Sequence, residues 1–343
     1  MRELLKTFAA ICALLFIFTG VLSLILFNIE NRAFSSTTYK QAFTDQRLYE
    51  RMPGILAATL STSISQNQNM VPFLRELTVE EWQAMISTFL PPEELRAMTD
   101  QTLDATFDYL NFRSNSVIIS LLPVKARLAG EAGVNVVRQF LQTQPACTVE
   151  QLTQMALGLL GGNIALCNPP EEAMSLLAPF IQSQLQTINA TFPNEIALVP
   201  GTESGTPLDP RLQLQAIRSA VRFSPFFVLL LLLTVAVLAV RSLRDLFIWW
   251  GWPLLITGTA GAMTAMIGSP IVGWFLQLLI LSQGAILLPP ILASSIGETA
   301  TAVAGQMLVP VILQGFIIAV VGLIMIILGI VLGRRQRYII TFT

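Results

Sequence analysis

The sequence predicts an all-α integral membrane protein with four transmembrane helices and a large helical extracytoplasmic domain between the first two. Three observations lead to this class. The 343-residue chain is 53% apolar and only 12% charged, about half the charged share of an average soluble domain. Four long stretches lack charged residues, and basic residues cluster at the ends of these stretches. A chain of this composition buries much of its surface in lipid.

The first span is expected over residues 7–29, a run of 23 residues without a charge, since about 20 residues suffice to cross a bilayer core. A cleaved signal peptide is the alternative, but its apolar core would hold roughly 7 to 15 residues, and no Ala-x-Ala site follows. An uncleaved anchor is therefore expected. The other spans are expected over residues 223–240, 246–269 and 308–333.

Basic residues set the predicted orientation. Segments 1–6, 241–245 and 334–343 together hold seven of them, and a four-span chain places all three segments on one side of the membrane. Cytoplasmic segments carry the excess of Lys and Arg. Both termini of this cell-membrane protein are therefore expected in the cytoplasm. A tryptophan cluster at the start of the third span marks a membrane boundary: Trp249, Trp250 and Trp252.

Residues 270–307 admit two interpretations. The stretch 271–292 is uncharged and long enough to cross the membrane, yet a fifth span would place the basic tail outside. Gln277 and the Pro289-Pro290 pair also suit a lipid-facing helix poorly. The segment is therefore expected to form an outer loop with an interfacial or re-entrant helix that Trp274 anchors.

Small residues recur at helical spacing in the third and fourth spans. Glycines seven residues apart share a helix face and let a neighbouring helix approach closely. No ionisable residue lies inside a predicted span, which argues against ion-coupled transport. Packing within the chain's own bundle is expected, with a partner-subunit interface as the alternative, for Gly258, Gly261, Ala262, Ala265, Gly315, Gly322, Gly329 and Gly333.

Residues 30–222 are predicted to form the helical domain, because apolar residues recur there at intervals of three and four. With 18 acidic and 13 basic residues, this domain lacks the clustered Lys and Arg that nucleic acid requires. A helix break is expected near Pro53 and a flexible link over 200–209. Asp209 is expected to cap a helix that continues into the second span.

Two parts of this domain echo each other. Thr-Val-Glu-Glu (78–81) precedes Pro-Pro-Glu-Glu (91–94), and Thr-Val-Glu-Gln (148–151) precedes a second Pro-Pro-Glu-Glu (169–172). Thr with Glu or Gln three residues later forms a capping box, and Pro followed by acids suits a first helical turn. Helices are expected to start at all four places, whether the echo is a duplication or a repeated use of common helix starts.

Cys147 and Cys167 are predicted to form a disulfide, because both lie in the domain expected to meet an oxidising environment. A helix of about 11 residues from Val149 covers about 16 Å, and the extended return from residue 161 can cover about 20 Å. The two sulfurs can therefore meet. Free thiols or pairing with another protein are the alternatives.

The sequence carries no recognisable catalytic, cofactor or metal motif. It has no histidine, which removes the commonest general base and metal ligand. Asp100, Asp104 and Asp108 stand four residues apart, and a solvated helix face is expected rather than a cation site. The predicted function is a non-enzymatic membrane scaffold, assembly or accessory subunit. It would act through its helical domain, in contact with membrane lipid and with a protein partner or a second copy, without a cofactor.

The order of one span, a large external domain and three spans resembles that of ABC permeases of the macrolide-exporter and division-permease type. The resemblance implies, as the alternative, a permease-like subunit of an ATPase-coupled transporter. The sequence departs from such permeases in its very short turn between the second and third spans, where they hold a cytoplasmic coupling helix, and in its long 270–307 segment. A membrane enzyme that uses external carboxylates is the third alternative.

Overall fold

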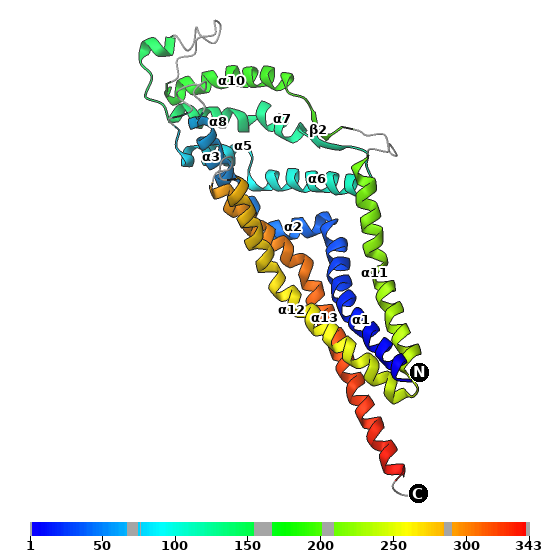
Figure 1. Cartoon of the computed structure of the whole chain (residues 1–343). Coiled ribbons are helices and arrows are strands. Elements are labelled where there is room, and N and C mark those ends of the chain that lie inside the picture. Colours follow the sequence, from blue (N-terminus) through cyan, green and yellow to red (C-terminus); the bar gives the residue numbers. More distant parts are fainter. Residues whose placement is uncertain are drawn as a thin grey trace. The chain divides into compact units, whose positions relative to one another are not determined.

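The computed structural model describes residues 2–66, 75, 77–153, 167–200, 209–284 and 290–340 (Figure 1). The chain forms two compact units: Met1–Ala42, Ser204–Ser282 and Ile296–Thr343 make the first, and Phe43–Glu203 with Gln283–Ser295 the second. The chain is 85% helical, which confirms the all-α class. Among the described residues, four helices are long and apolar enough to cross a membrane.

Those four helices lie within α1 (Arg2–Ala33), α11 (Pro210–Ala239), α12 (Leu243–Gly284) and α13 (Pro290–Ile340). Asp209 is the N-cap of α11 and accepts a hydrogen bond from the backbone N–H of Arg211. As predicted, α11 then runs unbroken into the second apolar segment. Three residues, 240–242, connect it to α12, which leaves no room there for a coupling helix.

The segment 270–307 differs from the predicted outer loop. α12 continues through Pro270 to Gly284, and α13 already begins at Pro290. A separate helix over 271–292 is therefore wrong, and only residues 285–289, outside the described part, separate two long helices. The prolines interrupt these helices less than the sequence pattern predicts: an interior proline removes one backbone hydrogen bond, and Pro290 occupies a first helical position, where proline is well tolerated.

Polar side chains connect α1 to its neighbours within the first unit. The hydroxyl groups of Ser23 and Ser224 are 2.7 Å apart, which joins α1 to α11. The Asn28 amide donates to the Gln314 side-chain oxygen at 2.7 Å, which joins α1 to α13. Such interhelical hydrogen bonds stabilise helix pairs in lipid.

A charged cluster lies at the end of α1. The carboxylate of Glu30, 4% exposed, accepts hydrogen bonds from Arg218 at 3.0 Å and from Arg222 at 3.1 Å. The Arg218 guanidinium lies 3.9 Å from the centroid of the Phe34 ring. These contacts extend the pairing of α1 with α11 past residue 29. The first unit includes these residues and extends to Ala42.

Glycines bring α12 and α13 into backbone contact. A Cβ atom on Gly258 would lie 2.5 Å from the carbonyl oxygen of Gly315, and one on Gly322 would lie 2.5 Å from the backbone nitrogen of Leu255. Distances this short are closer than van der Waals contact, so no side chain fits between the helices. We call this contact the glycine seam.

The glycine seam holds most of the small residues singled out in the sequence. Ala262 lies against Gly315, while Gly329 and Gly333 lie against Ile248 and Arg244. The other two residues pack nearby: Ala265 is buried with Leu308 and Val311, and Gly261 faces Leu24 of α1. Gly251, which the sequence argument passed over, faces Gly322 and Ile326.

The second unit is built from short helices and one two-stranded sheet. Its elements, which follow α2 (Ser36–Asp45), are α3 (Leu48–Gln66), α5 (Val79–Phe89), α6 (Pro92–Leu110), β1 (Val117–Ser120), α7 (Leu122–Ala129), α8 (Glu131–Gln142), α10 (Glu171–Thr191) and β2 (Glu195–Val199). Another helix begins at residue 149 and is described to residue 153.

Helices start at all four predicted places in this unit. Thr78 and Glu81 form a complete capping box at the start of α5, and Thr148 and Gln151 exchange the same two hydrogen bonds. α6 and α10 begin directly after Pro91 and Pro170. These starts depend on neighbouring residues alone, which is why spacing predicts them.

Two expectations for this unit are wrong. Residues 30–222 are not helical throughout, because β1 and β2 pair in antiparallel orientation with Ile119 opposite Ile196; β-branched residues such as those of β1 favour the extended backbone. The break near Pro53 is absent, since α3 continues through it. The expected flexible link falls largely on residues 201–208, outside the described part of the chain.

Candidate functional site

The predicted disulfide between Cys147 and Cys167 is confirmed, with Cα atoms 4.9 Å apart. The backbone N–H of Cys147 donates to the Asn168 carbonyl at 3.0 Å, and the N–H of Asn168 donates to the Pro145 carbonyl at 2.8 Å. The sulfur bridge and these two hydrogen bonds connect the end of α8 to the start of α10. Closing this loop contributes about 3 kcal/mol by restricting the unfolded chain.

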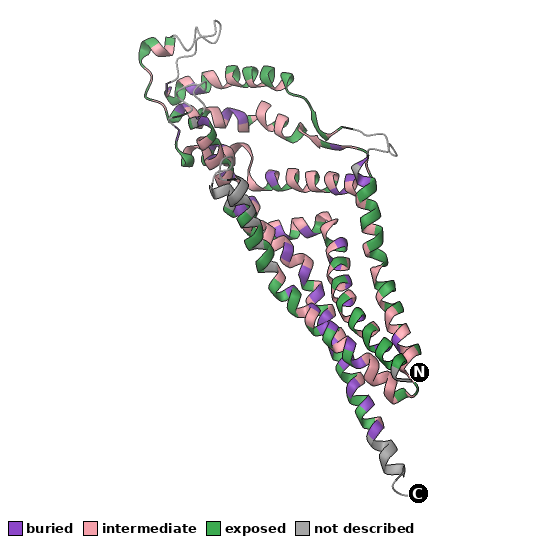
Figure 2. Cartoon of the chain, in the orientation of Figure 1, coloured by how far each residue is buried: buried purple, intermediate pink, exposed green. Residues whose placement is uncertain are grey.

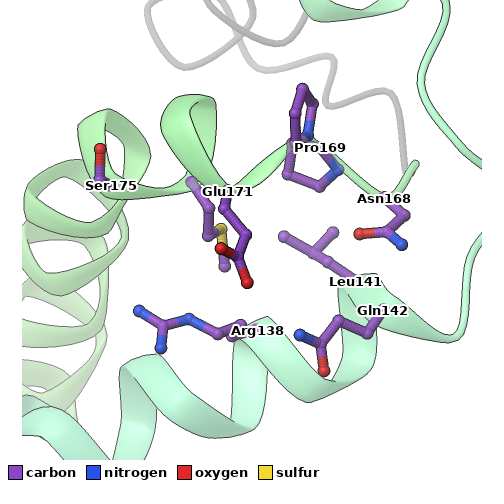
Figure 3. Close-up of a pocket in the computed structure, with 9 residues that line it drawn as sticks. Arg138, Leu141, Gln142, Asn168, Pro169, Glu171 and Ser175 are labelled. Atoms are coloured by element: carbon purple, nitrogen blue, oxygen red, sulfur yellow. The ribbon is translucent and has the colours of Figure 1, made fainter.

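A groove runs between α8 and α10 beside this disulfide. One cleft of about 540 Å³ lies at the start of α10, and a second of about 430 Å³ continues from it along the same two helices. Arg138 and Ser175 line both clefts. In Figure 3, Glu171 points from the start of α10 toward α8, and Arg138 and Gln142 of α8 lie on the opposite side of the space between the two helices. We call the two clefts together the α8–α10 groove.

The groove is rich in polar groups with unused hydrogen-bonding capacity. Within the described part of the chain, the Arg138 guanidinium, which is exposed, has no hydrogen-bond or ion-pair partner. Amide and carboxylate side chains surround it: Glu131, Asn135, Gln142, Asn168, Glu171 and Gln182. Such a lining suits recognition of a polar, extended ligand, because donors and acceptors alternate along its length.

The second notable surface is the outer face of α10. Its inner face packs on the domain: Met174 is buried, and Leu185 approaches Gly133 of α8. The outer face is also apolar, and Figure 2 shows α10 largely exposed. Exposed fractions reach 74% for Leu176 and 52% for Phe180. Leu176 and Phe180, four residues apart, form this outer apolar face. Further exposed apolar side chains follow at the end of α10 and on β2: Ile188, Phe192, Ile196 and Leu198.

Neither the groove nor the outer apolar face is among the sites predicted from the sequence, although the sequence contains one signal for the apolar face. Leu176-Leu177 and Phe180-Ile181 are adjacent apolar pairs, and neighbouring residues on a helix point to different faces. Two such pairs four residues apart indicate a helix with two apolar faces. No local sequence pattern predicts that Arg138 lacks a partner, because this depends on which side chains α10 places near it.

Asp100, Asp104 and Asp108 form an acidic stripe on α6, and two of them make ion pairs or hydrogen bonds within the domain. Asp100 accepts a hydrogen bond from the Tyr49 hydroxyl at 2.8 Å and lies 3.9 Å from Arg96. Asp108 lies 3.5 Å from Arg113. No group of three or more Cys, Asp or Glu side chains in the described ranges is arranged to hold a metal ion. The stripe therefore gives no support to a catalytic carboxylate site.

Four helices long and apolar enough to cross a membrane, in a chain that also holds a disulfide-bonded helical unit, are compatible with a multi-pass membrane protein. No family model, curated protein or solved structure matches this chain.

Proposed function

We propose that this chain is a non-enzymatic membrane scaffold, assembly or accessory subunit whose helical domain docks a partner protein on the outer apolar face of α10. The observation that carries the proposal is the second apolar face of that helix. A helix that is apolar on both sides is normally covered on both sides, and clustered exposed apolar side chains mark interaction sites.

The α8–α10 groove complements this surface. The apolar face supplies the area whose burial stabilises an interface, and Arg138 with its neighbouring amides supplies directional hydrogen bonds. Arginine is enriched among residues that dominate binding energy at interfaces. The chain's lack of histidine also favours docking over catalysis.

The proposed setting is a cell membrane with both termini in the cytoplasm and the helical domain outside. Its support is the three basic segments, which share one side in a four-span chain. A reporter that is active only in the cytoplasm should be active when fused after Thr343, and a reporter that is active only outside the cytoplasm should be inactive there. The opposite result would contradict the orientation and would reopen the question of residues 271–292.

Site-specific crosslinking tests the docking proposal directly. A photoreactive residue replacing Phe180 should give one discrete adduct in native membranes, whereas one replacing Gln186, an exposed polar position on the same helix, should give little. Leu176→Glu, introduced beside the probe, should abolish the adduct, because a charge in an apolar interface is costly.

The size of the adduct separates the outcomes. A mass equal to two copies of the chain would identify self-association, the other partner expected from the sequence. Equal labelling from both positions, or an adduct that survives Leu176→Glu, would contradict docking on this face. Circular dichroism of the Leu176→Glu chain checks that the change, at a side chain 74% exposed, leaves the helices intact.

A further inference from the structure

An apolar groove lies between α1 and α12 in the first half of each helix. Its volume is about 460 Å³, and only apolar residues line it. α1 contributes small side chains, Ala10 and Ala13, which leave space between the helices. Trp252 and Pro253 form part of the opposite wall. Pro253 has no backbone N–H, so α12 lacks one hydrogen bond at this level.

Basic residues stand at the end of this groove where both helices begin. Lys6 precedes Ala10 by four residues, and Arg244 precedes the lining residue Ile248 by four, so each lies about 6 Å farther along its helix axis. Figure 1 shows the start of α1 and the α11–α12 turn at the same end of the first unit. Residues 1–6 and 241–245 together hold four bases and two acids.

Two of these basic residues have no oppositely charged partner among the described residues. Within the described ranges, neither Arg241 nor Arg244 has an ion-pair partner, and the Nε atom of Arg244 is buried without a hydrogen bond. Arg244 also packs against Gly333, after which the sequence adds three more arginines in residues 334–337. This end of the bundle therefore carries an excess of positive charge beside an apolar groove.

We propose that the α1–α12 groove holds an acyl chain of one anionic phospholipid, whose phosphate binds the basic residues at the groove's end. The inference rests on the membrane insertion proposed above. A phospholipid satisfies both parts of the site, since its tail is apolar and its head group carries the missing negative charge. A second apolar helix would fill the groove and leave the arginines unpaired.

Native mass spectrometry of the full chain in mild detergent tests this assignment with two lipids, phosphatidylglycerol and phosphatidylcholine. The unmodified chain should retain about one phosphatidylglycerol and much less phosphatidylcholine. Ala13→Trp, which fills the groove, should abolish retention of both. The matched control is Val237→Trp on α11, where the side chain is 76% exposed and lines no part of the groove; it should retain the lipid.

Two further variants separate the tail from the head group. Trp252→Ala should weaken retention of both lipids by opening the groove without filling it. Lys6→Gln with Arg241→Gln should lower phosphatidylglycerol retention alone, by roughly fivefold for each charge removed, and so reduce the preference for anionic lipid. Circular dichroism and resistance to alkaline extraction show that each variant is folded and inserted.

Several results would overturn the proposal. Equal retention of the two lipids, or equal retention by the Ala13→Trp and Val237→Trp chains, would mean that the bound lipid is ordinary surrounding lipid. A dimer without lipid that Ala13→Trp dissociates would assign the groove to a second copy. A chain that is inserted and crosslinks its partner but retains no lipid would reject this inference and leave the proposed function standing.

Discussion

Tyr49 joins α3 to α6 at the scale of single residues. Its hydroxyl donates to Asp100, and the Arg96 guanidinium lies 5.5 Å from its ring centroid. Burial first, and then the hydrogen bond to Asp100, raise the pKa of Tyr49 above its ordinary value of 10.0. The folded chain therefore holds this proton more tightly than the unfolded chain does.

The raised pKa has a defined consequence for stability. The contribution of Tyr49 to the free energy of unfolding is fully present below about pH 10. It declines as the pH rises above that value, because the tyrosine of the unfolded chain loses its proton first. Tyr49→Phe should lower the free energy of unfolding at pH 7 by about 1 kcal/mol and should remove this part of the alkaline decline. Thermal unfolding at pH 8 to 11, followed by circular dichroism, compares the two chains. Parallel curves above pH 10 would contradict the assignment.

Glu30 offers a second test at this scale, since its one buried carboxylate accepts hydrogen bonds from two arginines. Glu30→Gln should destabilise the chain by about 1.5–3 kcal/mol, the range for hydrogen bonds to charged groups, because Arg218 is only 11% exposed. Arg222→Gln should cost under about 1 kcal/mol, since Arg222 is 57% exposed. Unfolding temperatures in detergent provide the comparison. Equal losses would mean that Arg222 carries as much of the contact as the buried arginine.

Sequence patterns predict contacts between residues near in the sequence better than contacts between distant residues. The capping boxes and the cysteine pair depend on spacings of a few residues to about twenty, and chain geometry alone brings such groups together. The α8–α10 groove and the charged cluster around Glu30 depend on which helices pack against one another. Glu30 and Arg218 are separated by 188 residues, and no local pattern records that they meet.

At the scale of elements, the glycine seam predicts a strong dependence on side-chain size. Gly258→Ala or Gly322→Ala should destabilise the chain by about 1–3 kcal/mol, the usual cost of overpacking. Gly305→Ala is the matched control on α13, because nothing lies within 4 Å of the added carbon. It should be neutral or slightly stabilising, since alanine favours the helix. Thermal unfolding ranks the three variants, and similar behaviour of all three would argue against close contact along the seam.

Sequence patterns predict some contacts between elements but not the short strands or the end of α12. Glycines at seven-residue spacing in the fourth span foretell a helix contact, and Gly251 with Gly258 repeats the same spacing. The strands escaped prediction because four or five residues are too few for alternation to stand out. The helical course of residues 270–284 escaped it because the glycines, serines and prolines in and around that stretch are poor formers of isolated helices, although packing between helices tolerates them.

At the scale of the whole molecule, the disulfide leaves Cys12 as the remaining thiol of three cysteines. The unfolded but unreduced chain should therefore accept one maleimide, and the reduced chain three, as counted by intact mass. Replacing both bonded cysteines by serine should lower the free energy of unfolding by about 3 kcal/mol. Three maleimides without reduction would show that the thiols are free in the cell.

The glycine seam also restricts how the long apolar helices can move relative to one another. Sliding α12 along α13 by one helical turn, about 5.4 Å, would move Gly258 and Gly322 out of these contacts and put larger side chains against the opposing backbone. The pair is thus confined to moving as one rigid hairpin. α1 meets this hairpin through side chains, such as the hydrogen bond from Asn28 to Gln314 and the contact of Leu24 with Gly261, which can break and re-form. Any relative motion of the four long helices would therefore occur between the hairpin and the α1–α11 pair, and the hairpin itself would keep its register.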